Sequence, residues 1–137
     1  MLVILDTNVL VAAIRSRRGA LFQVVSRIGT DAFNLAVSVP LVLEYESALL
    51  RHVAATELDE DDVLAIVDYI CFVARRQPIF LLWRPLLRDP NDDMIAEAAI
   101  AAGCDAVVTH DRSDFKELAQ FGVRVLSPRE FLGEIGG

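Results

Sequence analysis

The sequence predicts an α/β fold in which helices cover both faces of a five-stranded parallel sheet. Short apolar segments recur along the chain without the alternation of a half-exposed strand, as expected for strands buried on both faces. Segments with helical spacing separate them, which implies right-handed crossovers between parallel strands. No internal repeat, low-complexity tract or linker interrupts the 137 residues. We therefore expect residues 1–137 to form a single domain.

Five apolar segments are predicted to be strands. They are residues 2–5, 33–37, 79–83, 106–109 and 123–126. The first strand leads directly into Asp6, with no basic region and no cleavage site before it. This start argues against a signal peptide.

Seven segments are predicted to be helices. They are residues 8–14, 20–28, 40–52, 58–76, 92–102, 113–120 and 128–132. Gly29 and Gly103 follow two of them, where glycine commonly ends a helix, and Pro40 suits the first position of another. Residues 40–77 are expected to be a helical insertion without a strand, attached to one flank of the sheet.

Composition excludes several classes of protein. Hydrophobic residues make up 54% of the chain, which is too many for a disordered protein. No apolar run reaches the ~18 residues of a membrane span. Cys71 and Cys104 lack metal-site spacing, and we expect free buried thiols in a reducing cytoplasm.

The net charge of −7 counts against a simple nucleic-acid-binding module, which usually has a basic surface. It counts less against a nuclease, because bound metal would neutralise some of the acids. Twelve of the thirteen basic residues are arginine. Arg15, Arg17 and Arg18 follow the first predicted helix, and the planar guanidinium suits phosphate, so they are candidates for substrate binding.

Acidic residues stand where predicted strands end or helices begin. The candidates for catalysis are Asp6, Glu44, Asp93, Asp111 and Asp114. In a parallel sheet these positions converge on one edge. Clustered carboxylates repel each other unless a cation lies among them, and oxygen ligands favour Mg²⁺ or Mn²⁺. Such a cluster predicts metal-assisted cleavage of a phosphodiester.

Local patterns narrow some of these choices. Asp6 follows the first strand, although it or Thr7 could cap the next helix, and Asn8 could orient Asp6 or hold a water. The stripe of Leu41, Tyr45, Ala48 and Leu49 places Glu44 within or beside the buried face of its helix. Glu46 falls away from that stripe. A carboxylate on an inward face needs a partner or ligand, which selects Glu44.

Other acids stay ambiguous or are interpreted as structural. Asp89, Asp92 and Asp93 open the fifth helix, and one of them, or Asn91, is expected to cap it. The spacing of apolar residues does not show which of the three faces the site. It also does not separate Asp111 from Asp114. Asp59 is the expected cap of the fourth helix, and the acids at 60–62 suit its dipole. His52 and His110 lack partners at metal-binding spacing.

The full set of motifs resembles the PIN domain. The series is D-T-N after the first strand, a lone Glu in the third helix, D-D-M-I-A before an alanine-rich helix, and T-H-D-R-S-D-F after the next strand. The resemblance covers the whole chain in order and spacing. It implies a five-stranded parallel sheet and a Mg²⁺- or Mn²⁺-dependent ribonuclease. Small stand-alone bacterial members are toxins paired with an antitoxin and often dimerise, so the resemblance implies RNA, an antitoxin and a second copy as partners.

The same resemblance assigns roles to residues. Asp6, Glu44 and Asp93 match the first three acids, and Asp111 or Asp114 matches the fourth. The metal would be held by Asp6, Asp93, Asp111 and Asp114. Thr109 matches a supporting hydroxyl, and Asn8 a small polar residue after the first acid.

Two other functions are weighed against this one. A phosphatase with a nucleophilic aspartate usually needs a second acid two residues on and a lysine. Asn8 occupies that position, and Lys116, the only lysine, lies in a late helix. A non-catalytic module that keeps the fold is the other alternative, and the complete acidic set argues against it.

Overall fold

Five parallel strands form one sheet, as the sequence predicts, in the order β3-β2-β1-β4-β5. We describe them from a computed structural model that covers residues 1–15, 20–78 and 90–136. The strands are β1 (Leu2–Leu5), β2 (Asn34–Val37), β3 (Arg75–Arg76), β4 (Ala106–Val108) and β5 (Arg124–Leu126).

β1 is the central strand because its backbone pairs with β2 on one side and β4 on the other. Val3 lies opposite both Leu35 and Ala106 in these ladders. The chain order changes direction between β1 and β4. In open parallel sheets this switch point, at the carboxyl ends of the strands, is where ligands bind.

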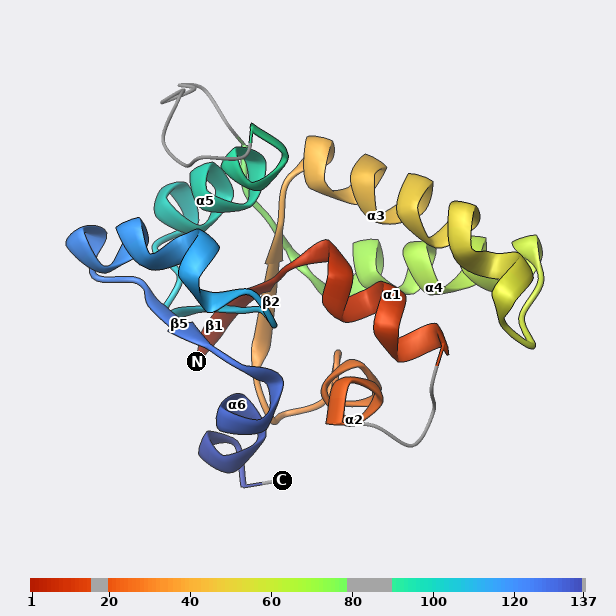
Figure 1. Ribbon diagram of the computed structural model, residues 1–137, viewed down its shortest axis with the longest axis horizontal. Helices are drawn as coiled ribbons and strands as arrows, with labels where there is room; N and C mark the ends of the chain where they lie inside the picture. Colours follow the sequence, from red (N-terminus) through yellow and green to blue (C-terminus); the bar gives the residue numbers. More distant parts are fainter. Residues whose placement is uncertain (16–19, 79–89, 137) are drawn as a thin grey trace.

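In the described residues, eight helical segments surround the sheet (Figure 1). They are α1 (Thr7–Arg15), α2 (Ala20–Ser26), α3 (Val39–His52), η1 (Val53–Ala55), α4 (Glu60–Val73), α5 (Pro90–Ala102), η2 (Arg112–Phe121) and α6 (Pro128–Glu134). Helix α1 packs against α2 and α3, α3 packs against α4, and α5 packs against β1, β2 and η2. Figure 1 shows α1 to α4 on one side of the strands and α5 with η2 on the other.

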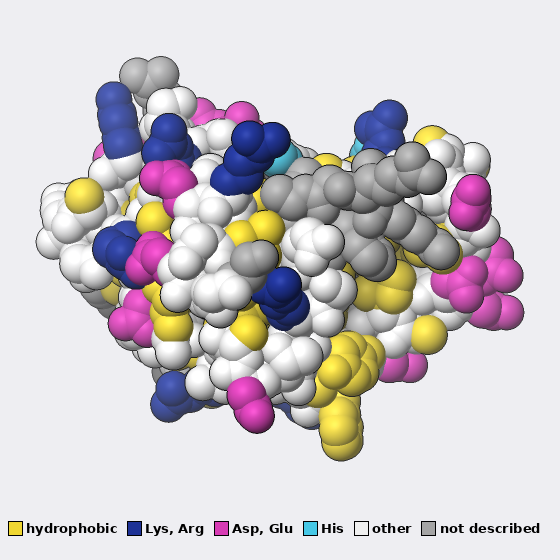
Figure 2. All heavy atoms as spheres, turned by 90° about the horizontal axis from the view of Figure 1, so that it is seen from below, with side chains coloured by type: hydrophobic (Ala, Val, Ile, Leu, Met, Phe, Trp, Pro, Cys, Tyr) yellow, Lys and Arg dark blue, Asp and Glu magenta, His cyan; other side chains and the backbone are white. Residues whose placement is uncertain are grey.

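Side chains cap three helix N-termini in the described residues, and the sequence predicts the one at Asp59. Ser38 accepts a hydrogen bond from the Leu41 N–H at the start of α3. Asp59 and Asp62 form a reciprocal capping box at α4, as Ser127 and Glu130 do at α6. The interpretation of Asp59 as a cap is therefore confirmed. Figure 2 shows acidic side chains gathered at the end of the molecule where α3 leads into α4.

The third strand and the helix before it differ from the prediction. We expected a helix over 58–76 and no strand within 40–77, but α4 ends at Val73 and Arg75–Arg76 forms β3. Ala74 is extended, and the next two residues pair with Ala36 and Val37 of β2. Alanine and arginine favour helices locally, so pairing with the sheet has overridden propensity. The strand predicted at 79–83 lies outside the described residues.

Two later helices also differ from the prediction. Helix α5 begins at Pro90, two residues early, which places Asn91 and Asp92 inside the helix and excludes both as its cap. The expected cap role for one of them is therefore wrong, and Asp89 lies outside the described residues. The segment predicted as a helix at 113–120 is a 3₁₀-helix, η2, closed by Gly122 at a positive φ of 76°.

Both cysteines are free thiols, as expected. Cys104 is buried, and burial raises the pKa of its thiol to about 12. Cys71 is half-buried. No helix in the described parts of the chain is long and apolar enough to cross a membrane.

A candidate acidic site at the carboxyl edge of the sheet

Asp6 lies at the centre of the predicted site, directly after β1. Its side chain is only 4% exposed. Its backbone N–H donates to the Val108 carbonyl at 3.0 Å, and its carbonyl accepts from Val9 at 2.9 Å. These bonds continue the β1–β4 ladder and begin α1, so the backbone of Asp6 is held from both directions.

Thr109 joins Asp6 to the segment that carries the next acid. The Thr109 hydroxyl donates to Oδ2 of Asp6 at 2.7 Å in a buried contact. The same oxygen accepts from the Asp111 N–H at 3.0 Å. One hydroxyl therefore links the carboxyl ends of two neighbouring strands and sets the turn that leads to Asp111.

Burial raises the pKa of the Asp6 carboxyl above its ordinary value. Hydrogen bonds from the Thr109 hydroxyl and the Asn8 backbone N–H oppose this shift, the negative charge of Asp111 adds to it, and His110 opposes it. Asp6 and Asp111 are therefore close enough to repel each other. The Asn8 contact is typical of an N-cap, so Asp6 also has the capping role that we weighed as an alternative.

Helix α3 places Glu44 beside the buried face, as its periodicity predicts. Its buried residues are Leu41, Tyr45, Ala48 and Leu49. The side chain of Glu44 is 32% exposed, and its Oε1 lies 3.7 Å from Nη2 of Arg51. Glu46 is half-buried as well, so exposure alone does not separate the two glutamates.

Helix α5 brings two buried acids, of which the sequence predicts one. Asp93 is 1% exposed and lies in the first turn, while Glu97 is 6% exposed and lies one turn later. Because α5 ends near the start of β4, its first turn lies toward the carboxyl edge of the sheet. Our sequence reasoning missed Glu97. Glu97 follows Asp93 by four residues in an otherwise apolar helix, so the two acids lie on the same helix face. This spacing could have identified Glu97 from the sequence.

The residues after β4 differ in their relation to Asp6. Asp111 and His110 are both exposed, and the charges of both act on the Asp6 carboxyl. Asp114 is exposed on η2, where its backbone N–H donates to the Asp111 carbonyl at 3.0 Å. The structure thus brings Asp111 toward Asp6, and places Asp114 one turn further along.

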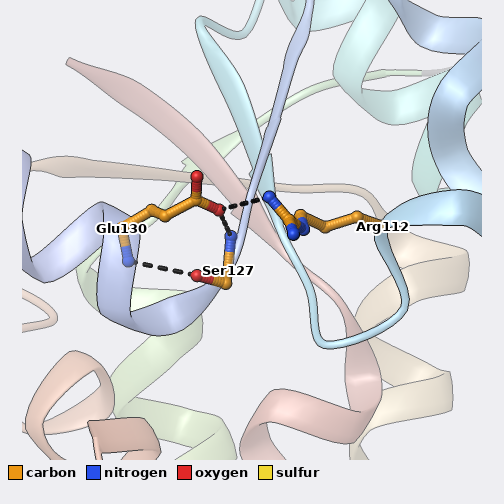
Figure 3. A network of polar contacts seen from close by, with 3 residues as sticks. All are labelled: Arg112, Ser127 and Glu130. Atoms are coloured by element: carbon orange, nitrogen blue, oxygen red, sulfur yellow. Dashed lines mark hydrogen bonds and ion pairs between the residues drawn. The ribbon is translucent and has the colours of Figure 1, made fainter.

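A polar network fixes the start of η2 against α6. Nη1 of Arg112 donates to Oε1 of Glu130 at 2.9 Å, and the Ser127 N–H donates to the same oxygen at 2.9 Å (Figure 3). Hydrogen bonds from Ser127, together with the charge of Arg112, hold the pKa of Glu130 below its ordinary value. Because Arg112 follows Asp111, this network restrains the segment that carries the acid.

The predicted metal ligands are only partly gathered. Among the described residues, no three His, Cys, Asp or Glu side chains lie close enough together to hold a metal ion. The negative charge of Asp111 helps to raise the pKa of the Asp6 carboxyl, and a cation between the two acids would relieve this repulsion. Carboxylate oxygens are the donors that Mg²⁺ and Mn²⁺ prefer, so the chemistry of the pair fits such an ion.

The arginine cluster is described only in part. Arg15 is exposed at the end of α1. Arg17 and Arg18 lie outside the described residues.

A known family matches most of this chain. The family model described as PIN domain matches residues 2–113. The chain belongs to the PIN-domain family. The resemblance inferred from the motifs is therefore confirmed, and no curated protein matches this PIN domain in sequence.

Two solved structures share the fold of this PIN domain. One is VapBC2 from Rickettsia felis bound to a DNA fragment from their promoter, with a TM-score of 0.63 and 17% identity over 93% of this chain and 98% of that one. The other is VapBC-1 from nontypeable Haemophilus influenzae, with a TM-score of 0.58 and 14% identity over 94% of this chain and 99% of that one. At these identities the likeness establishes the fold alone.

Proposed function

We propose that this PIN domain is an endoribonuclease that depends on Mg²⁺ or Mn²⁺. The observation that carries the proposal is the carboxylate of Asp6, which is 4% exposed and stands against a second carboxylate at the switch point of the sheet. A buried acid repelled by another acid is unfavourable for stability. Groups perturbed in this way concentrate at functional sites.

Asp6 and Asp111 would hold the cation, with Asp93 as the third acid. Asp111 is favoured over Asp114 as the fourth acid of the motif because its charge acts on Asp6. The chemistry that a bound divalent ion supplies is a lowered pKa of water and neutralisation of charge on the phosphate. Glu44 completes the acidic set.

The remaining residues orient these acids. The Thr109 hydroxyl and the Asn8 backbone N–H both donate to the Asp6 carboxylate, so they fix the direction of its oxygens. The buried position of Asp6 excludes bulk water from one side of the pair. A carboxylate held in one orientation needs little reorganisation when a ligand binds.

RNA is the proposed substrate and Arg15, with Arg17 and Arg18, its proposed phosphate contact. Arg15 is exposed on the helix that begins directly after Asp6. Replacing all three arginines by alanine should weaken RNA binding and reduce its salt dependence by up to about three charges. If the salt dependence of RNA affinity does not change, these arginines do not contact the RNA phosphates.

The proposal extends to partners. The two similar structures are VapBC proteins, and by analogy we propose a toxin that pairs with an antitoxin, forms a homodimer and acts in the cytoplasm. An antitoxin that inserts an arginine or lysine among the carboxylates would replace the cation and block the site. The analogy rests on fold and family membership.

The test is RNA cleavage by the purified protein. EDTA should abolish cleavage and added Mn²⁺ or Mg²⁺ should restore it. Asp6→Asn should remove most activity while the protein stays folded, whereas Asp68→Asn, a change at an exposed aspartate on α4, should not. Full cleavage in EDTA would contradict the metal requirement, and unfolding of the Asp6 variant would show that the carboxylate is needed for folding.

A further inference from the structure

We propose that Tyr45 is a positioning residue of the acidic site, whose hydroxyl ties helix α3 to the end of strand β1. The inference rests on the proposed function, because it concerns how the two acids beside this contact are held. Asp6 directly follows the carbonyl that Tyr45 binds. Glu44 directly precedes Tyr45 on α3.

The contact is short, buried and long-range in sequence. The Tyr45 hydroxyl donates to the Leu5 carbonyl at 2.5 Å across 40 residues of chain. Tyr45 and Leu5 are both 0% exposed. Leu5 is the last residue of β1, so the bond anchors α3 at the point where the strand gives way to Asp6.

The pKa of the Tyr45 hydroxyl is consistent with its position beside the end of β1. Burial raises the pKa of the Tyr45 hydroxyl well above its ordinary value, and the negative charge of Asp6 raises it further. The phenol therefore stays protonated at neutral pH and remains a donor. The hydroxyl binds the backbone carbonyl that directly precedes Asp6, so it is placed next to the residue that carries the acid.

A hydroxyl in this position does more than fill space. A phenylalanine would pack equally well, because the ring is enclosed on all sides, but it would leave the Leu5 carbonyl without this donor. A buried carbonyl that loses its partner tends to shift toward another one. The shift would move Asp6 relative to Glu44, so the expected effect falls on the geometry of the acids.

The chain contains a matched control. Tyr69, the only other tyrosine, lies on α4, and its hydroxyl donates to the Ile28 carbonyl at 3.2 Å across 41 residues. Both phenols thus bind a distant backbone carbonyl from a helix. Tyr69 is 49% exposed, and its acceptor follows α2, away from the acids after β1 and β4.

The first experiment compares Tyr45→Phe with Tyr69→Phe in the full-length protein. Mn²⁺ affinity is measured by calorimetry without RNA, and kcat and KM are measured with RNA. Tyr45→Phe should weaken Mn²⁺ binding about five-fold, the loss expected for one buried hydrogen bond, and should lower kcat more than it changes KM. Tyr69→Phe should leave both unchanged. Equal Mn²⁺ affinity in wild type and Tyr45→Phe would overturn the inference.

A second measurement tests the role of Tyr45 even if the Tyr45→Phe protein fails to fold. In the Tyr69→Phe protein, 3-fluorotyrosine labels Tyr45 alone and retains its hydroxyl. Addition of Mg²⁺ should shift the single ¹⁹F resonance, because the charge beside the hydroxyl changes. A resonance that does not respond to saturating Mg²⁺ would overturn the inference.

The two proposals fail in different ways. If wild-type protein neither binds Mn²⁺ nor cleaves RNA, the proposed function is wrong and the positioning role falls with it. If wild-type protein does both, and the Tyr45 variant matches it, only the positioning role is wrong.

Discussion

The hydroxyl of Thr109 donates a 2.7 Å hydrogen bond to the carboxylate of Asp6 and joins the carboxyl ends of the two strands at the switch point of the sheet. The same oxygen accepts from the backbone N–H of Asp111 at 3.0 Å. One side chain therefore orients the carboxylate of Asp6 and the turn that carries Asp111. This dual contact needs a group that is both donor and acceptor, which a hydroxyl provides.

Thr109→Val should destabilise the protein and weaken the site together. Valine keeps the shape but removes both hydrogen bonds, so the free energy of unfolding should fall by about 1–3 kcal/mol. Thr109→Ser, which keeps the hydroxyl, should retain most of the stability and activity. Urea unfolding at neutral pH measures the first effect and RNA cleavage the second. Equal stability of the valine and serine variants would show that these bonds contribute little.

Asp6→Asn should stabilise the metal-free protein in a way that depends on pH. Burial raises the pKa of Asp6 in the folded protein above its ordinary value of 3.8, so the unfolded chain loses this proton at a lower pH than the folded protein does. As pH rises from 3.8 through the folded-state value, the wild type loses stability that the asparagine variant keeps.

Thermal unfolding in EDTA from about pH 3 to about pH 7 tests this effect. The melting temperatures should converge at the acidic end, and the variant should melt higher at the neutral end. A variant that melts lower at every pH would show that the favourable contacts of the Asp6 carboxylate outweigh its burial and its repulsion from Asp111.

Glu44→Gln should abolish most activity, and Glu46→Gln should leave it nearly unchanged. The two glutamates lie on one helix with similar exposure and differ in phase, since Glu44 directly precedes Tyr45 of the buried stripe. Both variants should stay folded, because the contact of Glu44 with Arg51 is a long 3.7 Å pair near the surface. RNA cleavage and circular dichroism are the measurements. The reverse order of activities would contradict the role given to Glu44.

Arg112→Ala should reduce cleavage more than it reduces stability. Its ion pair with Glu130 is half-exposed and screened by solvent, so its loss should change the free energy of unfolding only slightly. The restraint on the neighbouring Asp111 would be lost, which should lower kcat several-fold. Urea unfolding and cleavage kinetics separate the two effects.

Arg124→Ala is the matched control for that variant. Arg124 pairs with Glu134 of the same helix α6 at 2.7 Å with similar exposure, but it lies at the start of β5. Its replacement should change stability by a similar amount and leave cleavage intact. Equal loss of activity in both variants would mean that α6 docking matters in general, and that Arg112 has no special relation to Asp111.

The sequence by itself determined the features that depend on nearby residues. Strands buried on both faces, the cap at Asp59 and the buried stripe of α3 follow from composition and spacing within a few residues. The order of acids along the chain resembled that of the PIN domain, and the family match confirmed this membership. That acids at strand ends share one edge followed from the predicted parallel sheet, because parallel strands bring their carboxyl ends together.

Only the tertiary structure decided features that join distant residues. Arg75–Arg76 forms a strand because its backbone pairs with β2, although alanine and arginine favour helix locally. Asp111 lies nearer Asp6 than the sequence could tell, since Thr109 sets the turn between two strands that are a hundred residues apart. The bond from Tyr45 to Leu5 has no local signature at all, because a donor and a backbone acceptor 40 residues apart meet only when α3 packs on the sheet.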